Sequence, residues 1–449
     1  MERKLSDLVI FGGRLVDPSR GLDAPGSVHI RDGRIVRLGI GEEQPGSECR
    51  TAIDARGMIV CPGFIDLHCH LRQPGFEDKE TIATGTRAAA RGGFTTVCCM
   101  PNTDPPLDTA ATIEYVRALA ALEGAVRVLP VGCVTRERAG AELADFGELS
   151  EAGAVAFSDD GSPVADSSLM RMALEHSRET GLPIVNHCED RALSKGGVMN
   201  AGSLADRLKV NGIPAAAEEN MVSRDIDLAR VTGGRLHIAH VSTEGSVGLI
   251  RRAKEEGLDV TVEVTPHHLT LTEDEVAGYN TNAKVNPPLR TGRDTEALVR
   301  GLNEGVIDCI ATDHAPHTPE DKAQPFNDAD FGISGFETAL GSLMSLVHRG
   351  KIELATLISK LTHEPASYLG REDIGTLREG AVADIAVLHP DRQWTVKPEE
   401  FASKGKNTPL AGRVLRGKVM CTISRGLIVY RDEALAVGPA CAGPGVGSA

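Results

Sequence analysis

The fold of this chain is indicated first by residues 58–70, which read MIVCPGFIDLHCH. An apolar run of strand length (58–67) ends there in two histidines that flank a cysteine. Seven further short runs follow, separated by longer segments of helical character: FTTVCCM (94–100), VRVLPVGCV (126–134), AVAFSD (154–159), PIVNHC (183–188), RLHIAHV (235–241), LDVTVEVT (258–265) and IDCIAT (307–312). Strands that alternate with helices in this way predict an α/β fold, a closed (β/α)8 barrel of the TIM type. An open doubly wound parallel sheet shares the alternation and is the second possibility.

Both ends of the chain differ in rhythm from its middle. Residues 1–57 and 376–432 read as short strands separated by turns, with Gly-Gly and Asp-Gly as turn formers in the first segment. We therefore predict a small β-sandwich domain built from both chain ends, with the catalytic barrel (58–375) inserted between its parts. Residues 433–449 are rich in Ala, Gly and Pro and are predicted to be a flexible tail.

The composition is that of a globular protein, with 41% hydrophobic and 25% charged residues. A formal net charge of −15 argues against broad contacts with nucleic acid or an anionic membrane. The sequence has neither a signal-peptide pattern nor a run of about 18 apolar residues that could span a bilayer. Its cysteines lie mostly in apolar runs, as buried thiols do, so we expect a reduced, cytoplasmic protein.

Potential metal ligands gather where the predicted strands end. Side chains two apart in a strand share a face, so His68 and His70 point the same way and Cys69 points opposite. The other strand ends supply Asp159 and Asp160, His187, His240, and Asp313 and His314. The carboxyl ends of barrel strands converge on one mouth, where active sites lie. Four imidazoles and two carboxylates there suit two divalent cations bridged by a carboxylate and a hydroxide.

Alternation along the strands chooses between neighbouring candidates. With the bulkier Val155 and Phe157 against the helices, Asp160 faces the barrel and is favoured over Asp159. The same alternation directs His187 and His240 inward. It directs His237 outward, where we expect a packing residue.

Further polar side chains beside these strand ends predict a site for an anion. They are Arg72 in HLRQPG, Asn102 in CMPNT, Asn286 in KVNPPLR and His317 in DHAPH. An arginine with amide donors can hold a carboxylate through charge-assisted, bidentate hydrogen bonds. Residues 319–335 are predicted to form a mobile loop over the site.

Several segments of the chain are distinctive because they occur together and in this order: PGFIDLHCHLRQPG, ARGGFTTVCCMPNT, AFSDDG, HCED, HVST, TPHH, KVNPPLR, IDCIATDHAPH, NTPLAG and GLIVYRD. In these segments the chain resembles the dihydroorotases of the amidohydrolase superfamily, in their bacterial type I form. The resemblance covers about residues 5–432. Gln73, where many relatives have Glu, and Asn186, where Ala is common, depart from the family pattern, and we expect both to tune activity only.

The resemblance implies zinc as the cofactor, with two ions per subunit. His68, His70, Asp160 and Asp313 would hold one ion, and Asp160, His187 and His240 the other, with Asp160 bridging. Asp313 would be the catalytic acid/base. Substrate contacts would come from His70, Arg72, Asn102, Asn286, His317 and the backbone of Phe331 and Gly332.

The reaction implied is the reversible cyclisation of N-carbamoyl-L-aspartate to L-dihydroorotate and water, a step of pyrimidine (UMP) synthesis, through a metal-bridging hydroxide. The resemblance also implies a homodimer and a possible partner, aspartate carbamoyltransferase. Hydantoinases and many allantoinases share the fold but use a carbamylated lysine as the bridge, and residues 151–183 contain no lysine. An inactive dihydroorotase-like partner of the transferase is a further alternative, although every ligand position here is filled.

Overall fold

The computed structural model describes residues 7–41 and 50–438, and eight parallel strands form a barrel in the middle of this chain. The strands are β6 (Phe64–Cys69), β7 (Phe94–Cys99), β8 (Arg127–Pro130), β9 (Phe157–Ser158), β10 (Ile184–Asn186), β13 (Leu236–Ile238), β14 (Val260–Val264) and β15 (Cys309–Ile310). Hydrogen bonds join β6–β7–β8 into one sheet and β9–β10–β13–β14–β15 into another. Parallel bridges from Gly132 to Phe157 and from Cys69 to His314 link the two sheets at both edges. The predicted barrel is therefore confirmed, and the open sheet is not formed.

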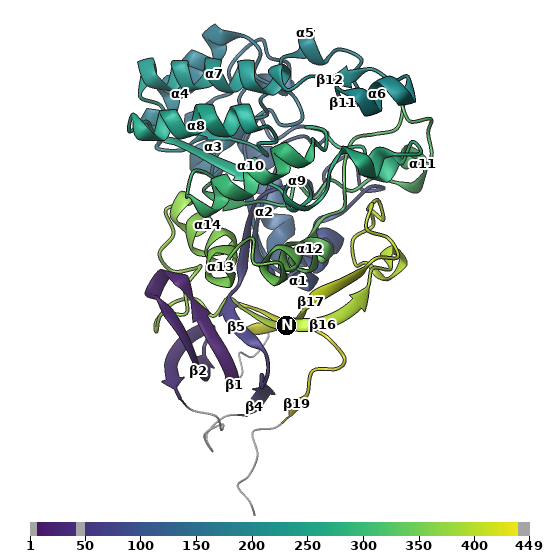
Figure 1. Cartoon of the computed structure of the whole chain (residues 1–449). Coiled ribbons are helices and arrows are strands. Elements are labelled where there is room, and N and C mark those ends of the chain that lie inside the picture. The colour runs from purple at the N-terminus through teal and green to yellow at the C-terminus, as the bar shows by residue number, and fades with distance from the viewer. Residues whose placement is uncertain (1–6, 42–49, 439–449) are drawn as a thin grey trace, which may run out of the picture.

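Helices lie outside the barrel strands and connect them (Figure 1). The longer ones are α1 (Ile82–Arg91), α2 (Ala110–Glu123), α3 (Phe146–Ala152), α4 (Ser167–Thr180), α7 (Ala216–Thr232), α8 (Glu244–Glu255), α10 (Gly292–Asn303), α12 (Phe336–His348) and α13 (Leu354–Leu361). Shorter elements are α5 (Arg191–Ser194), β11 (Met199–Asn200), α6 (Ser203–Leu208), β12 (Gly212–Ile213), α9 (Pro266–Thr270), α11 (Pro319–Lys322) and α14 (His363–Tyr368). In α4 the carboxylate of Asp166 accepts the first free N–H groups, and Gly181, with a φ of +72°, ends the helix.

A single break divides the apolar run 58–67, which we predicted as one strand. Residues Ile59–Pro62 form β5, which pairs with β16 (Ile385–Thr395) in the terminal sheet, and β6 starts only at Phe64. Gly63 lies between them because a Cβ there would approach Cγ2 of Thr95 to 2.3 Å. The N-terminal part of the sheet thus reaches Pro62, beyond the expected boundary at residue 57.

Both chain ends meet in one mixed sheet at the foot of the barrel (Figure 1). Its other strands are β1 (Leu8–Asp17), β2 (Leu22–Arg31), β3 (Arg34–Ile40), β4 (Thr51–Asp54), β17 (Val414–Ser424), β18 (Leu427–Arg431) and β19 (Val437–Gly438). They enclose a hydrophobic cluster of their own, which includes Leu15, Ile35 and Ile385. The β domain predicted from both ends is therefore present. Within the predicted tail, β19 pairs with β4, and residues 439–449 lie outside the described residues.

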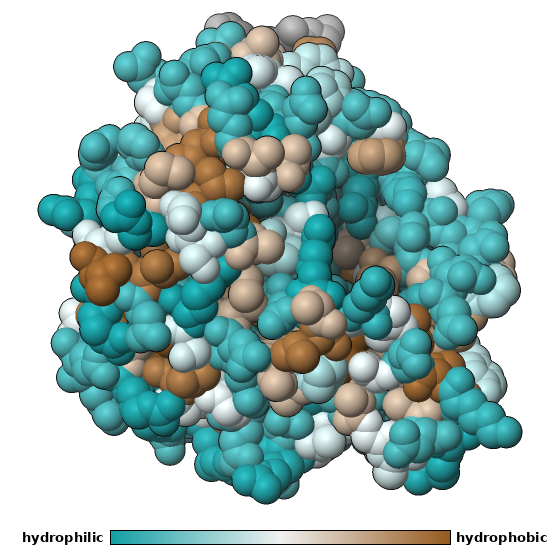
Figure 2. Space-filling view, turned by 90° about the horizontal axis from the view of Figure 1, so that it is seen from above, coloured by the Kyte–Doolittle hydropathy of each residue, from teal (hydrophilic) through white to brown (hydrophobic). Residues whose placement is uncertain are grey.

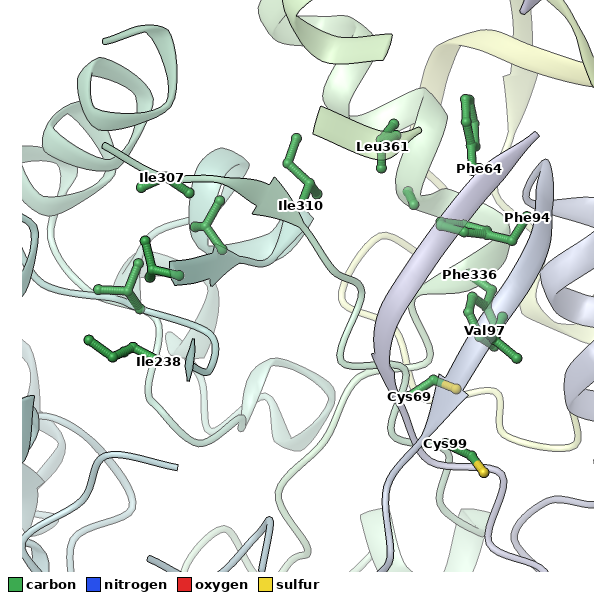
Figure 3. Close-up of a cluster of buried hydrophobic side chains, with 14 of the residues drawn as sticks. Phe64, Cys69, Phe94, Val97, Cys99, Ile238, Ile307, Ile310, Phe336 and Leu361 are labelled. Atoms are coloured by element: carbon green, nitrogen blue, oxygen red, sulfur yellow. The ribbon is translucent and has the colours of Figure 1, made fainter. Parts of the chain in front are cut away.

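The barrel packs in two layers, and β6 changes the layer that it faces along its length. Ile65 and Leu67 belong to the cluster inside the barrel, whereas Cys69 belongs to the cluster between strands and helices. A break in strand register between Asp66 and Cys69 causes this switch. Figure 3 shows the outer cluster, in which Phe94 contacts Phe64 and Phe336 with ring centroids 5.6 and 5.4 Å apart. The switch leaves His68 and His70 facing the interior at the mouth.

Among the described residues, every helix is too short or too polar to cross a bilayer. The face in Figure 2 is mainly hydrophilic, and its hydrophobic residues form small, separate patches.

Candidate active site

A cleft of about 250 Å³ lies at the mouth of the barrel. Its walls bring together nearly all the residues predicted for the site: His70, Arg72, Asn102, Asp160, His187, His240, Asn286, Asp313, His317, Phe331 and Gly332. His68 lies behind this wall, fully buried. A larger cavity, about 740 Å³, is lined by residues of α12, β16, β17 and β18 and contains none of the predicted residues.

The carboxylate of Asp160 lies between two pairs of imidazoles. Its Oδ2 is 3.4 Å from Nε2 of His68 and 3.5 Å from Nε2 of His70. Its Oδ1 is 3.4 Å from Nε2 of His240 and 3.8 Å from Nδ1 of His187. Each oxygen thus faces a separate pair of ring nitrogens, which is the arrangement that a bridging carboxylate requires.

Unsatisfied buried atoms show that the residues present fit metal ions. Nε2 of His68 and Oδ1 of Asp160 are buried and have no hydrogen-bond partner. Such atoms are costly unless something occupies the space between them. Two groups of side chains bring ligand atoms close enough to share a cation, namely His68–Asp160–His240 and His68–His70–Asp313. Imidazole and carboxylate are donors suited to zinc and similar divalent ions.

Two neighbouring side chains orient the first imidazole pair. Nδ1 of His68 donates to Oε1 of Glu263 at 2.6 Å, and Nδ1 of His70 donates to Oδ1 of Asn102 at 2.9 Å. Because Nδ1 is engaged in this way, each ring presents its Nε2 to Asp160 and Asp313. We expected Asn102 to contact substrate, and its amide nitrogen is still available for that. Sequence reasoning missed Glu263, although a carboxylate between two valines (262–264) was a usable signal.

Replacing Glu263 by Gln should weaken metal binding by about 10- to 100-fold, because the hydrogen bond that orients His68 loses its charged acceptor. The measurement is competition for the metal with a chelator of known affinity. Because Glu263 is buried and pairs with His68, a matched thermal melt checks that the variant folds. Wild-type metal affinity in a folded variant would exclude this role for Glu263.

The prediction for His237 was wrong in direction. We expected it to point outward, but its Nε2 lies 3.3 Å from Oε2 of Glu263, and its ring packs against Tyr368 at 4.6 Å. Ala239, two residues on, also belongs to the interior cluster. His237 and Ala239 therefore lie on one face, as alternation requires. The alternation does not continue to His240, where the backbone has a φ of +33°. This turn in the backbone brings His240 to the cleft, with its Nε2 3.4 Å from Oδ1 of Asp160.

Asp313 has the surroundings of an ionised acid/base. Its Oδ1 lies 3.0 Å from Nε2 of His70 and 3.6 Å from Nε2 of His68. Burial acts to raise the pKa of Asp313, but the hydrogen bond to His70 and the nearby imidazoles outweigh it and hold that pKa well below the usual range. The carboxylate is therefore charged near neutral pH and can accept a proton.

The opposite wall of the cleft carries Arg72, His317 and the carboxylate of Asp330. Nη2 of Arg72 lies 3.3 Å from Nε2 of His317. Nε of Arg72 donates to the carbonyl of Pro316 at 3.3 Å. Burial, with the charges of Arg72 and Lys79, lowers the pKa of His317 to about 4, so His317 is neutral at pH 7. Arg72 therefore supplies the positive charge on this wall, and Asp330 supplies a negative one.

Asn286 lies deeper, beside the second imidazole pair. Its Nδ2 is 3.3 Å from Nε2 of His187 and from Oε2 of Glu189. Glu189, in HCED, is a second carboxylate that sequence reasoning missed. Asn286 thus links the predicted substrate side of the cleft to His187, one of the predicted metal ligands.

Gln73 and Asn186, which depart from the family pattern, form hydrogen bonds outside the cleft. Oε1 of Gln73 accepts the N–H of Ile82 at the start of α1. Nδ2 of Asn186 donates to Oδ2 of Asp225, and its Oδ1 accepts from the N–H of Val164. Neither residue is among those that line the cleft.

Known proteins resemble this chain in sequence and in fold. A family model described as dihydro-orotase-like matches residues 57–246. Dihydroorotases of Pelotomaculum thermopropionicum and Citrifermentans bemidjiense are 52% and 49% identical, each over 95% of this chain and 99% and 100% of their own lengths. Among solved structures, the L-hydantoinase (dihydropyrimidinase) of Arthrobacter aurescens superposes with a TM-score of 0.85 at 26% identity, over 97% of this chain and 98% of its own. The similarity to the dihydroorotases extends over nearly the whole chain, and this protein belongs to the dihydroorotase family.

Proposed function

We propose that this enzyme catalyses the reversible cyclisation of N-carbamoyl-L-aspartate to L-dihydroorotate and water, in pyrimidine synthesis. The observation that carries the proposal is the position of Asp160, with one oxygen facing His68 and His70 and the other facing His187 and His240. Arg72 lines the same cleft and supplies the charge that a carboxylated substrate needs.

The proposed cofactor is zinc, with two ions held by His68, His70, Asp160, His187, His240 and Asp313. When bound, divalent cations lower the pKa of a water from about 15.7 toward 7 and polarise a carbonyl group. In the hydrolytic direction Asp313 takes a proton as water attacks the ring amide carbonyl, and delivers a proton to the departing ring nitrogen. The amide C–N bond breaks and the water oxygen enters a new carboxylate.

Substrate selection follows from charge. Arg72 and Asn102 would hold the carboxylate outside the ring, which neutral hydantoins and allantoin lack. The absence of lysine from residues 151–183 leaves no candidate for a carbamylated bridge, whereas Asp160 lies in the bridging position. These two features favour dihydroorotate over the neutral cyclic amides.

The direct test measures metal content together with turnover of dihydroorotate, hydantoin and allantoin. We expect two metal ions per chain and a clear preference for dihydroorotate. Preference for a neutral substrate would support the hydantoinase or allantoinase alternative, and loss of all turnover in a metal-loaded protein would support the inactive partner.

Arg72→Ala should raise the KM for dihydroorotate by roughly 10- to 100-fold, because a charge-assisted hydrogen bond is worth about 1.5–3 kcal/mol. Steady-state kinetics at saturating zinc measure this change. Arg72→Lys is the matched variant, because it retains the charge but loses the bidentate geometry. Its KM should fall between those of wild type and Arg72→Ala. An unchanged KM in Arg72→Ala would remove Arg72 from substrate binding.

Cytoplasmic location, a homodimer and association with aspartate carbamoyltransferase are also part of the proposal. The eight cysteines of the described residues are all free and buried, as in a protein that functions under reducing conditions. The homodimer and the transferase partner rest on the family resemblance.

A further inference from the structure

Lys284 directs all its hydrogen-bonding capacity into one loop. It stands two residues before Asn286 and is 2% exposed. Its Nζ donates to the carbonyls of Phe326, Asn327 and Ala329 at 2.7, 3.0 and 2.6 Å. An ammonium group has three N–H donors, so each donor has a backbone acceptor in residues 326–329.

Lys322, at the end of α11, does the same for the next part of the loop. Its Nζ donates to the carbonyls of Asp330 and Gly332 at 2.6 and 3.2 Å, and lies 3.4 Å from the carbonyl of Lys284. Burial is the largest influence on the pKa of both lysines and lowers both. Holding two ammonium groups side by side without a hydrogen-bonded carboxylate on either is costly, and the carbonyl groups compensate for that cost.

The segment that these lysines hold forms part of the cleft. Phe331 and Gly332 line it together with Asp160 and Asp313. The N–H of Gly332 donates to the carbonyl of Lys284 at 2.9 Å, and Nζ of Lys284 lies 4.5 Å from the centroid of the Phe331 ring. A Cβ on Gly332 would approach the carbonyl oxygen of Ala315 to 2.7 Å, so the backbone at Gly332 is packed tightly against Ala315. A small movement of residues 326–332 would therefore change the shape of the cleft.

We propose that Lys284 and Lys322 are positioning residues, which set the backbone of Phe331 and Gly332 for contact with the ring of the substrate. The inference rests on the proposed function, because it assigns the ring of a carboxylated cyclic amide to this wall of the cleft. Neither lysine touches the metal ligands in the structure. Their contribution is therefore to substrate binding and not to metal binding or proton transfer.

The test compares Lys284→Met and Lys322→Met, which retain an apolar side chain but lose the donors. We expect the KM for dihydroorotate to rise at least about tenfold in each, the size expected when a hydrogen bond to substrate is lost. Metal content and kcat should stay within about threefold of wild type. Amide hydrogen exchange should become faster in residues 323–332.

Lys406→Met is the matched control, because Nζ of Lys406 also donates to backbone carbonyls, those of Phe401 and Ser403, in a loop that does not line the cleft. Its KM should equal that of wild type. Faster exchange in residues 323–332 with an unchanged KM would overturn the inference and leave the lysines a purely structural role. If one of the two lysine variants fails to fold, the KM of the other tests the inference.

Failure of this inference can be distinguished from failure of the proposed function. If metal-loaded wild-type enzyme does not turn over dihydroorotate, the proposed function fails. If the wild type is active and both lysine variants retain its KM, only the positioning role fails.

Discussion

Asp313→Asn is expected to lose about 10²- to 10⁴-fold in turnover of dihydroorotate while the protein retains its metal. The amide has nearly the same shape and can still present an oxygen to the cation, but it cannot accept a proton. Oδ1 of Asp313 is 3.0 Å from Nε2 of His70, and Asp313 lines the cleft in which we propose that the substrate binds. Kinetics and metal analysis of the same preparation measure the two quantities together.

Asp308→Asn provides a matched control for this change. Asp308 precedes β15, at the opposite end of the strand from Asp313, and pairs with Lys254 at 2.6 Å. The amino-terminal ends of barrel strands contribute to stability, not to catalysis, so Asp308→Asn should retain wild-type kcat. Equal activity of Asp313→Asn and wild type would remove Asp313 from the mechanism.

Asp160→Ala is expected to reduce bound metal to at most one ion per chain and turnover by on the order of a thousand-fold or more. Asp160 is the carboxylate that, among the described residues, lies within 4 Å of both imidazole pairs. Metal analysis after dialysis, followed by an activity assay with added zinc, gives the result. The expected thousand-fold loss of turnover corresponds to the loss of about 4 kcal/mol of transition-state stabilisation.

Asp159→Asn is the neighbouring control, because its carboxylate faces away from the metal site. It accepts hydrogen bonds from the N–H groups of Val134 and Thr135 and from the hydroxyl of Thr135. We expect wild-type metal content and a free energy of unfolding lowered by about 1–3 kcal/mol. If Asp159→Asn lost the metal and Asp160→Ala retained it, the assignment of the bridging residue would be reversed.

Alternation of side chains predicted the orientation of some residues and not of others. Ala156 belongs to the interior cluster and Phe157 to the outer one, as predicted, but Val155, which we predicted to lie against the helices, packs against the interior cluster. Alternation failed at His237, because β13 ends at Ile238 and the backbone turns at His240. It also missed the break at Gly63, where close contact with Thr95 divides one apolar run between two domains.

The sequence by itself determined the barrel, the terminal β domain, the candidate ligands and the family, because each of these is expressed in local patterns and in the order of short motifs. The tertiary structure alone decided which atoms meet. Oδ1 and Oδ2 of Asp160 face different imidazole pairs, Glu263 orients His68 from 195 positions away, and Lys284 reaches carbonyls 42 to 45 positions along the chain. Such contacts depend on how the closed barrel and its loops pack. The spacing of residues along the chain does not indicate that packing.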